Sequence, residues 1–103
     1  MSVTYVIGFD VVPAQRARFL ALLNGVLDAM SAEKNFHRAF LHADPDNSYR
    51  FLLYETWESH EDVLNIQLHR PYRVAWHAAL PELLARERDV QVLAPLTMIP
   101  NAG

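Results

Sequence analysis

Large apolar and smaller or polar residues alternate at the start of the chain, over residues 3–12. Every second position of VTYVIGFDVV holds a large apolar side chain: Tyr5, Ile7, Phe9 and Val11. The segment is also rich in β-branched and aromatic residues. A period of two places successive side chains on opposite faces of a strand, so this pattern predicts a β-strand over residues 3–12.

The spacing changes to three and four residues between Pro13 and Met30. Proline suits the first turn of a helix, where its missing N–H has no partner to lose. The apolar positions that would share one helical face are Phe19, Leu22, Leu23, Val26, Leu27 and Met30. This spacing predicts an amphipathic helix that starts near Pro13.

Two further segments, NFHRAFLHA (35–43) and YRFLLYETW (49–57), have the composition of strands. The residues DPDNS lie between them, and Asp, Pro and Asn are typical of tight turns. The two segments therefore predict a β-hairpin.

A second helical segment is expected from Ser59 onward. Ser59 followed by Asp62 resembles a helix N-terminal capping pair. The helix is expected to break or restart at Pro71, and Pro81 is expected to kink or restart it again. The apolar stripe after the first break consists of Tyr72, Ala75, Trp76, Ala79 and Leu83.

The segment VQVLAPLTM (90–98) predicts a last strand, which Pro95 places toward the edge of a sheet, and residues 99–103 predict a loose tail. The order strand, helix, strand, strand, helix, strand is the split β-α-β unit of the ferredoxin-like α+β fold, with an antiparallel sheet and two helices on one face. A chain of 103 residues fits one domain, here 1–103 with a core at about 3–97.

Apolar residues on both faces of a strand indicate that both faces of the sheet are covered. Strands 3–12 and 49–57 have this character, whereas a sheet with one wet face would alternate cleanly. No segment of the chain remains to cover the second face, so the sequence predicts a twofold homodimer.

Charge and composition exclude several classes of partner. The net charge is −3, which argues against the basic footprint of a nucleic-acid-binding protein. Without cysteine the chain has no disulfide and no thiolate metal site. No segment approaches the ~20 apolar residues of a membrane span, and the N-terminus lacks a cationic stretch followed by an apolar run. We expect a soluble cytoplasmic protein that binds neither nucleic acid nor membrane.

Residues 55–84, ETWESHEDVLNIQLHRPYRVAWHAALPELL, resemble the antibiotic biosynthesis monooxygenase (ABM) family of dimeric α+β barrels, which includes small quinol monooxygenases. In that family the third strand ends in a Glu-x-Trp-like pattern, matched by Glu55 and Trp57. A helix and a proline–aromatic step follow, matched by Pro71 and Tyr72. The resemblance implies an apolar pocket between sheet and helices in each subunit.

The haem-degrading branch of the family has a different pattern. Its pattern is similar to an Asn in the first strand, a Trp in the second helix and a His ligand further on. Strand 3–12 of this chain has no Asn. Ile66 stands near the Trp position and Trp76 near the His position. We therefore expect no cofactor. The histidines also lack the spacing of metal ligands, since His69 and His77 lie on either side of the expected helix break.

The resemblance implies a cofactor-independent monooxygenase that uses dioxygen and a quinol or polycyclic phenol. Such chemistry requires a base, and a neutral His has a suitable pKa. His69 is the first candidate because it precedes the helix break, and Tyr72 is expected to hydrogen-bond a substrate oxygen. A solvent-facing His69 and a core Tyr72 are the alternatives.

Four further residues are candidates for binding an aromatic substrate: Trp57, Asn65, Trp76 and His37. Trp76 lies one turn beyond Tyr72 and would add an aromatic wall, although plain core packing is the more usual role of both tryptophans. His37 is also a secondary base candidate. Two other functions stay open: an isomerase on the same scaffold, and a non-catalytic ligand-binding or stress-response dimer.

Overall fold

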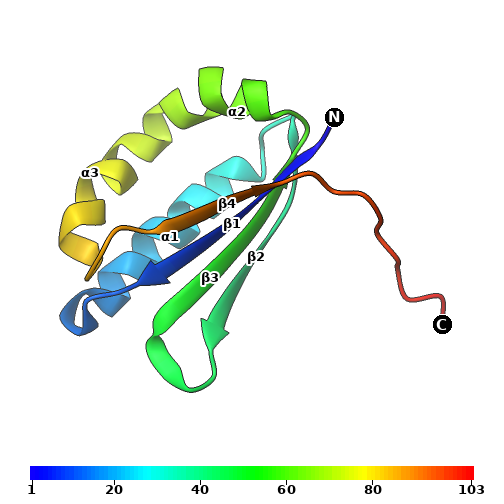
Figure 1. Ribbon diagram of the computed structural model, residues 1–103. Helices are drawn as coiled ribbons and strands as arrows, with labels where there is room; N and C mark the ends of the chain where they lie inside the picture. The colour runs from blue at the N-terminus through cyan, green and yellow to red at the C-terminus, as the bar shows by residue number, and fades with distance from the viewer.

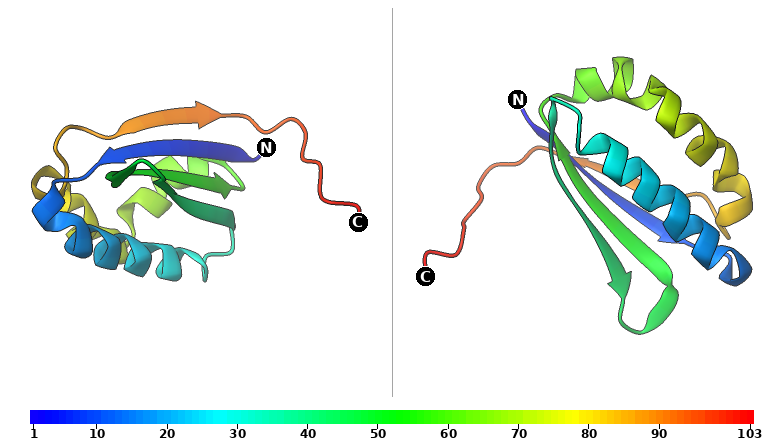
Figure 2. Two further views of the ribbon diagram at one scale, coloured as in Figure 1. Left: turned by 90° about the horizontal axis from the view of Figure 1, so that it is seen from below. Right: turned by 180° about the vertical axis from the view of Figure 1, so that it is seen from behind.

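An antiparallel sheet forms one layer of the molecule, and the helices cover one of its two faces (Figures 1 and 2). The computed structural model describes all residues, 1–103. The sheet has four strands in the order β2-β3-β1-β4, and they are β1 (Val3–Asp10), β2 (Phe36–Asp44), β3 (Asn47–Trp57) and β4 (Asp89–Leu93). All pairs are antiparallel, which confirms the predicted ferredoxin-like α+β fold.

The helical layer consists of α1 (Arg16–Met30), α2 (His60–Asn65) and α3 (Val74–Leu83). A 3₁₀ turn at Pro13–Gln15 leads into α1, as the position of Pro13 predicts. Two more 3₁₀ turns, Gln67–His69 and Pro71–Arg73, join α2 to α3. These turns bend the chain, so that α2 and α3 arch over the sheet beside α1 (Figure 1).

The predicted hairpin is confirmed, with β2 and β3 joined through Pro45 and Asp46. Asp44 Oδ1 accepts a hydrogen bond from the Asp46 N–H at 2.8 Å. Asn47 Oδ1 accepts one from the Tyr49 N–H at 2.9 Å. These side chains bond to backbone two residues on, which is why Asp and Asn favour such turns.

The two expected helix breaks have different outcomes. The Ser59 Oγ accepts a hydrogen bond from the Asp62 N–H at 3.2 Å, so the predicted cap is present, and the chain restarts at Pro71 as expected. The predicted restart at Pro81 does not occur, because α3 continues through it to Leu83. Pro81 is exposed and lies in the last turn of α3, where it removes only one intrahelical hydrogen bond.

The last strand is shorter than predicted. β4 ends at Leu93 rather than continuing to residue 98, and it pairs with β1 alone. It is an edge strand, as Pro95 suggests. Residues 94–103 extend away from the rest of the molecule (Figure 1).

Aromatic side chains fill the core between the sheet and the helices. The Phe9 ring centroid lies 5.2 Å from that of Phe19 and 5.8 Å from that of Trp76, both edge-on. Phe9 and Phe19 are fully buried. Because helix and sheet residues share this cluster, it fixes the distance between the two layers.

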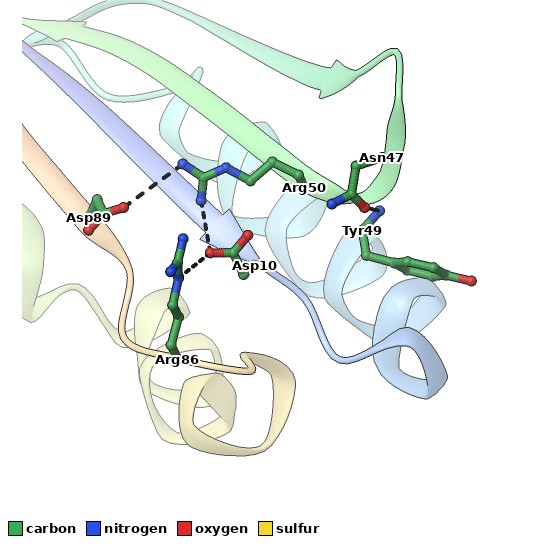
Figure 3. Close-up of polar contacts among 6 residues, drawn as sticks. All are labelled: Asp10, Asn47, Tyr49, Arg50, Arg86 and Asp89. Atoms are coloured by element: carbon green, nitrogen blue, oxygen red, sulfur yellow. Dashed lines mark hydrogen bonds and ion pairs between the residues drawn. The ribbon is translucent and has the colours of Figure 1, made fainter.

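A network of charges ties the ends of three strands together (Figure 3). The Asp10 Oδ2 accepts hydrogen bonds from Arg50 Nη1 at 3.1 Å and from Arg86 Nε. Arg50 also lies 3.9 Å from the carboxylate of Asp89. Gly8 gives Arg50 room to cross β1, since a Cβ there would stand 2.6 Å from its Nη2. The network positions the connection that leads from α3 to β4.

Candidate functional site

A cavity of about 200 Å³ lies between the sheet and the helices. Of its 19 lining residues 14 are hydrophobic, so the walls favour an apolar ligand. They come from β1, β3 and β4 on one side and from α1, α2 and α3 on the other. Val90 and Val92 line it from the edge strand β4.

The other five lining residues carry the polar chemistry: Glu55, His60, Arg73, His77 and Arg88. Tyr5 adds a hydroxyl group. β1 and β3 place Tyr5 directly opposite Glu55, and both are buried. A few convergent polar groups in an apolar cavity are typical of a ligand site.

Glu55 is buried on the helix side of β3. Its Oε1 accepts a hydrogen bond from the Trp57 indole N–H at 3.2 Å. Burial raises the pKa of Glu55, and the positive charge of Arg73 opposes this effect. The neutral carboxyl form is therefore more populated than in an exposed glutamate.

Arg73 is 6% exposed, at the end of the turn Pro71–Arg73. Its guanidinium carbon lies 5.7 Å from the centroid of the Trp57 ring, which is a cation–π contact. Its Nε and Nη2 atoms are buried and have no hydrogen-bond partner. No carboxylate forms an ion pair with Arg73 or with Arg88.

Tyr5 and His60 form a second polar pair in the cavity. The Tyr5 hydroxyl lies 2.7 Å from His60 Nδ1, which is a hydrogen bond. Burial, and then the charge of Glu55, raise the pKa of Tyr5. Tyr5 therefore keeps its proton at neutral pH and offers a hydroxyl hydrogen-bonded to an imidazole.

His77 follows Trp76 on α3 and lines the cavity. Burial lowers the pKa of His77, and the positive charges of Arg88 and Arg73 lower it further. The imidazole is therefore neutral at pH 7, with a lone pair on one ring nitrogen. A second hollow, of about 620 Å³, shares His77, Arg88 and Val90 with the cavity and adjoins it there.

The tryptophans and Tyr72 occupy partly different places from those predicted. Trp76 lines the cavity. Trp57 is fully buried and reaches the site through its contacts with Glu55 and Arg73. Tyr72 is half-buried outside the lining, and its hydroxyl is buried without a partner. Burial raises the pKa of Tyr72.

The remaining predicted site residues lie outside the cavity. His69 is exposed in the turn Gln67–His69, and Asn65 is exposed at the end of α2. His37 is exposed on β2, where its Nε2 lies 2.7 Å from a carboxylate oxygen of Glu58. The structure thus brings Trp76 to the cavity but not His69 or Tyr72, and the catalytic and binding roles of these residues stay predictions.

Sequence reasoning missed several polar residues of the cavity. Tyr5 and Glu55 stand in the apolar, helix-facing rows of their strands, and a polar group in such a row is a signal for a buried site. Arg73 precedes Trp76 by three residues and so shares its face of the helical segment. Arg88 lies in a loop without any pattern that would predict its position.

No group of three or more His, Asp or Glu side chains is arranged to hold a metal ion. None of the helices has the length and the apolar character that crossing a membrane requires.

Comparisons with known proteins agree with this architecture. The sequence model of the family "antibiotic biosynthesis monooxygenase" matches residues 2–84. A search of curated proteins by sequence found no match.

Several solved structures are similar to this chain. Rv0793 from Mycobacterium tuberculosis is 27% identical with a TM-score of 0.86, and the match covers 97% of this chain and 100% of that one. SnoaB, a cofactor-independent oxygenase from Streptomyces nogalater, is 21% identical with a TM-score of 0.81, and the match covers 97% and 98%. A putative antibiotic biosynthesis monooxygenase from Nitrosomonas europaea is 16% identical with a TM-score of 0.85, over 92% and 90%.

Proposed function

Since the chain belongs to the antibiotic biosynthesis monooxygenase family, we propose that it is a cofactor-independent monooxygenase acting on a quinol or a polycyclic phenol. The observation that carries this proposal is the cavity, which combines apolar walls with a neutral imidazole. SnoaB, a similar structure, is described as a cofactor-independent oxygenase, which supports the reaction class.

The cavity suits a planar aromatic substrate. Trp76 supplies a flat wall, and apolar side chains of the sheet and of α1 and α2 supply most of the rest. Tyr5 is a polar group on the sheet side of the same space. The adjoining hollow of about 620 Å³ gives room for rings that exceed the cavity itself.

The reaction requires removal of a proton from the substrate. A phenolate is rich in electrons and reduces dioxygen directly: one oxygen atom enters the substrate as a carbonyl, and the other leaves as water with two substrate hydrogens. His77 is the best-placed base, because it lines the cavity and is neutral at pH 7. His69, the base predicted from the sequence, is exposed and does not line the cavity. A base must lie within hydrogen-bond reach of the proton that it removes, so His69 is less well placed for a substrate bound in the cavity.

Oxygen consumption tests the proposal. A panel of two-ring and three-ring quinols and phenols is added to the purified protein without metal or flavin, and an oxygen electrode records uptake. We expect uptake with at least one compound and a product that gains one oxygen atom from ¹⁸O₂. Turnover that persists without oxygen would instead identify an isomerase. Binding without any turnover would identify a ligand-binding protein.

We also propose that the protein is a homodimer. The face of the sheet opposite the helices carries large exposed apolar side chains: Phe40, Leu52 and Tyr54. Phe40 lies directly opposite Tyr54 across β2 and β3, so they form one continuous patch. The extended residues 94–103 expose Leu96 and Ile99 almost completely. A second copy, packed against this face, would cover both features.

A further inference from the structure

The lining of the cavity carries more positive than negative charge. Arg73 and Arg88 both line it, and Glu55 is the only carboxyl group that does. Even a fully ionised Glu55 leaves one positive charge uncompensated, and burial opposes its ionisation. Charges removed from water without a partner are costly, so this arrangement favours binding of an anion.

The unpaired atoms of Arg73 define the shape of that anion. Nε and Nη2 lie on one edge of the guanidinium group, where their N–H bonds are parallel. This edge matches the two oxygens of a carboxylate, which accept both bonds side by side. Both nitrogens are buried and form no hydrogen bond within the chain, and Arg73 lines the cavity, so this edge is the part of Arg73 that would pair with a ligand's carboxylate.

The walls of the cavity favour a carboxylate over a phosphate. With 14 of its 19 lining residues hydrophobic and two arginines against one carboxyl group, the cavity matches a singly charged anion better than a doubly charged phosphate. A carboxylate has a single charge and two oxygens, which one arginine edge satisfies. Trp76 and the apolar residues then contact the hydrocarbon part of the ligand.

We infer that the cavity binds an aromatic carboxylate, whose carboxylate group pairs with Arg73 and whose rings lie against Trp76. Arg88, at the boundary with the adjoining hollow, adds a second positive charge along the ligand's path. The inference rests on the proposed function only in treating this ligand as the substrate, an aromatic acid with an oxidisable phenol ring.

Binding of two matched ligands tests the inference without turnover. 1-Hydroxy-2-naphthoate and 1-hydroxy-2-naphthamide share their rings and hydroxyl group and differ in charge. Isothermal titration calorimetry under argon gives both dissociation constants. We expect the acid to bind at least about tenfold more tightly than the amide, because charge-assisted hydrogen bonds are stronger than neutral ones.

Substitutions at Arg73 assign the effect to its guanidinium edge. Arg73→Met is expected to weaken binding of the acid at least about tenfold and to change binding of the amide little, since only the acid loses a charge partner. Arg73→Lys keeps the charge without the parallel edge and should give an intermediate affinity. Arg18→Gln, which removes a surface arginine paired with Glu82, is the control and should bind as the wild type does.

Circular dichroism establishes that each variant is folded. If Arg73→Met does not fold, Arg88→Gln takes its place, because Arg88 is only partly buried and its loss should also weaken the acid selectively. Equal affinities for acid and amide, no binding of the acid at about 1 mM, or a folded Arg73→Met variant with wild-type affinity would each overturn the inference.

The outcome of the binding experiment is independent of the oxygen-uptake measurement. Selective binding of the acid without oxygen uptake from any phenol leaves the anion site standing and contradicts the proposed monooxygenase. Oxygen uptake from neutral quinols with no preference for binding the acid supports the proposed monooxygenase and contradicts the anion site.

Discussion

At the scale of single residues, the environment of His77 determines its protonation state. Arg73 precedes it in the chain, Arg88 approaches from the loop before β4, and Glu55 lines the same cavity from β3. Burial and the two positive charges lower the pKa of His77 from its ordinary value of 6.5. The imidazole remains neutral to a lower pH than a free histidine does, which keeps it available as a base.

If His77 is the base, its titration governs the acidic limb of the pH profile. A protonated imidazole cannot accept a proton, so kcat/KM should rise with pH and reach half its plateau below pH 6.5. His77→Gln should reduce kcat by about 10²- to 10⁴-fold. Initial rates between pH 5 and 9 on a confirmed substrate measure both effects.

His69→Ala is the comparison variant, since His69 is the base predicted from the sequence and is exposed. Loss of turnover in His69→Ala with normal rates in His77→Gln would assign the base to His69 and reject His77. A half-plateau above pH 6.5 would also contradict the role of His77.

The sequence predicts these polar residues less well than it predicts the core. Periodicity identified the rows that hold Phe9 and Trp76, because burial of apolar groups produces a repeating pattern. The environments of Glu55 and Arg73 in the cavity depend on single contacts between distant segments. Such contacts depend on how the layers pack, and no local pattern encodes them.

At the scale of elements, the segment between α2 and α3 shapes the cavity. Two 3₁₀ turns replace a continuous helix, and Pro71 begins the second of them. The break brings Arg73 inward while His69 remains in solvent. A break was predicted from Pro71, but the residue that it would turn toward the cavity was not, because the direction of a bend depends on backbone angles.

Pro71 and Pro81 should affect stability in opposite directions. Pro71 occupies the first position of its turn, so Pro71→Ala should destabilise the protein by about 0.4–1 kcal/mol through the entropy of the unfolded chain. Pro81 lies inside α3, so Pro81→Ala restores a helical hydrogen bond and should stabilise by about 1 kcal/mol or more. Urea unfolding gives both values, and each variant is the control for the other. Changes of the same sign would contradict this assignment.

At the scale of the whole molecule, the two faces of the sheet have different roles. The helix-facing side holds the core and the cavity, whereas the opposite side leaves Phe40 and Tyr54 in solvent. The sequence already indicated that both faces need a cover, because strands 3–12 and 49–57 carry apolar residues on both faces. The end of β4 was harder to predict, because residues 94–98 have strand-like composition but pair with no other strand.

A dimer formed through the open face should dissociate when a charge is placed in it. Phe40 is 55% exposed on β2, and Phe40→Glu would bury a carboxylate against the apolar patch of a second copy. Val74 is 66% exposed on α3, in the helical layer, so Val74→Glu is the matched control. In analytical ultracentrifugation we expect wild type and Val74→Glu at twice the chain mass of 11.8 kDa, and Phe40→Glu at the monomer mass. A wild-type protein that sediments as a monomer at micromolar concentration would rule out the dimer. A dimeric Phe40→Glu variant would instead place the interface elsewhere on the molecule.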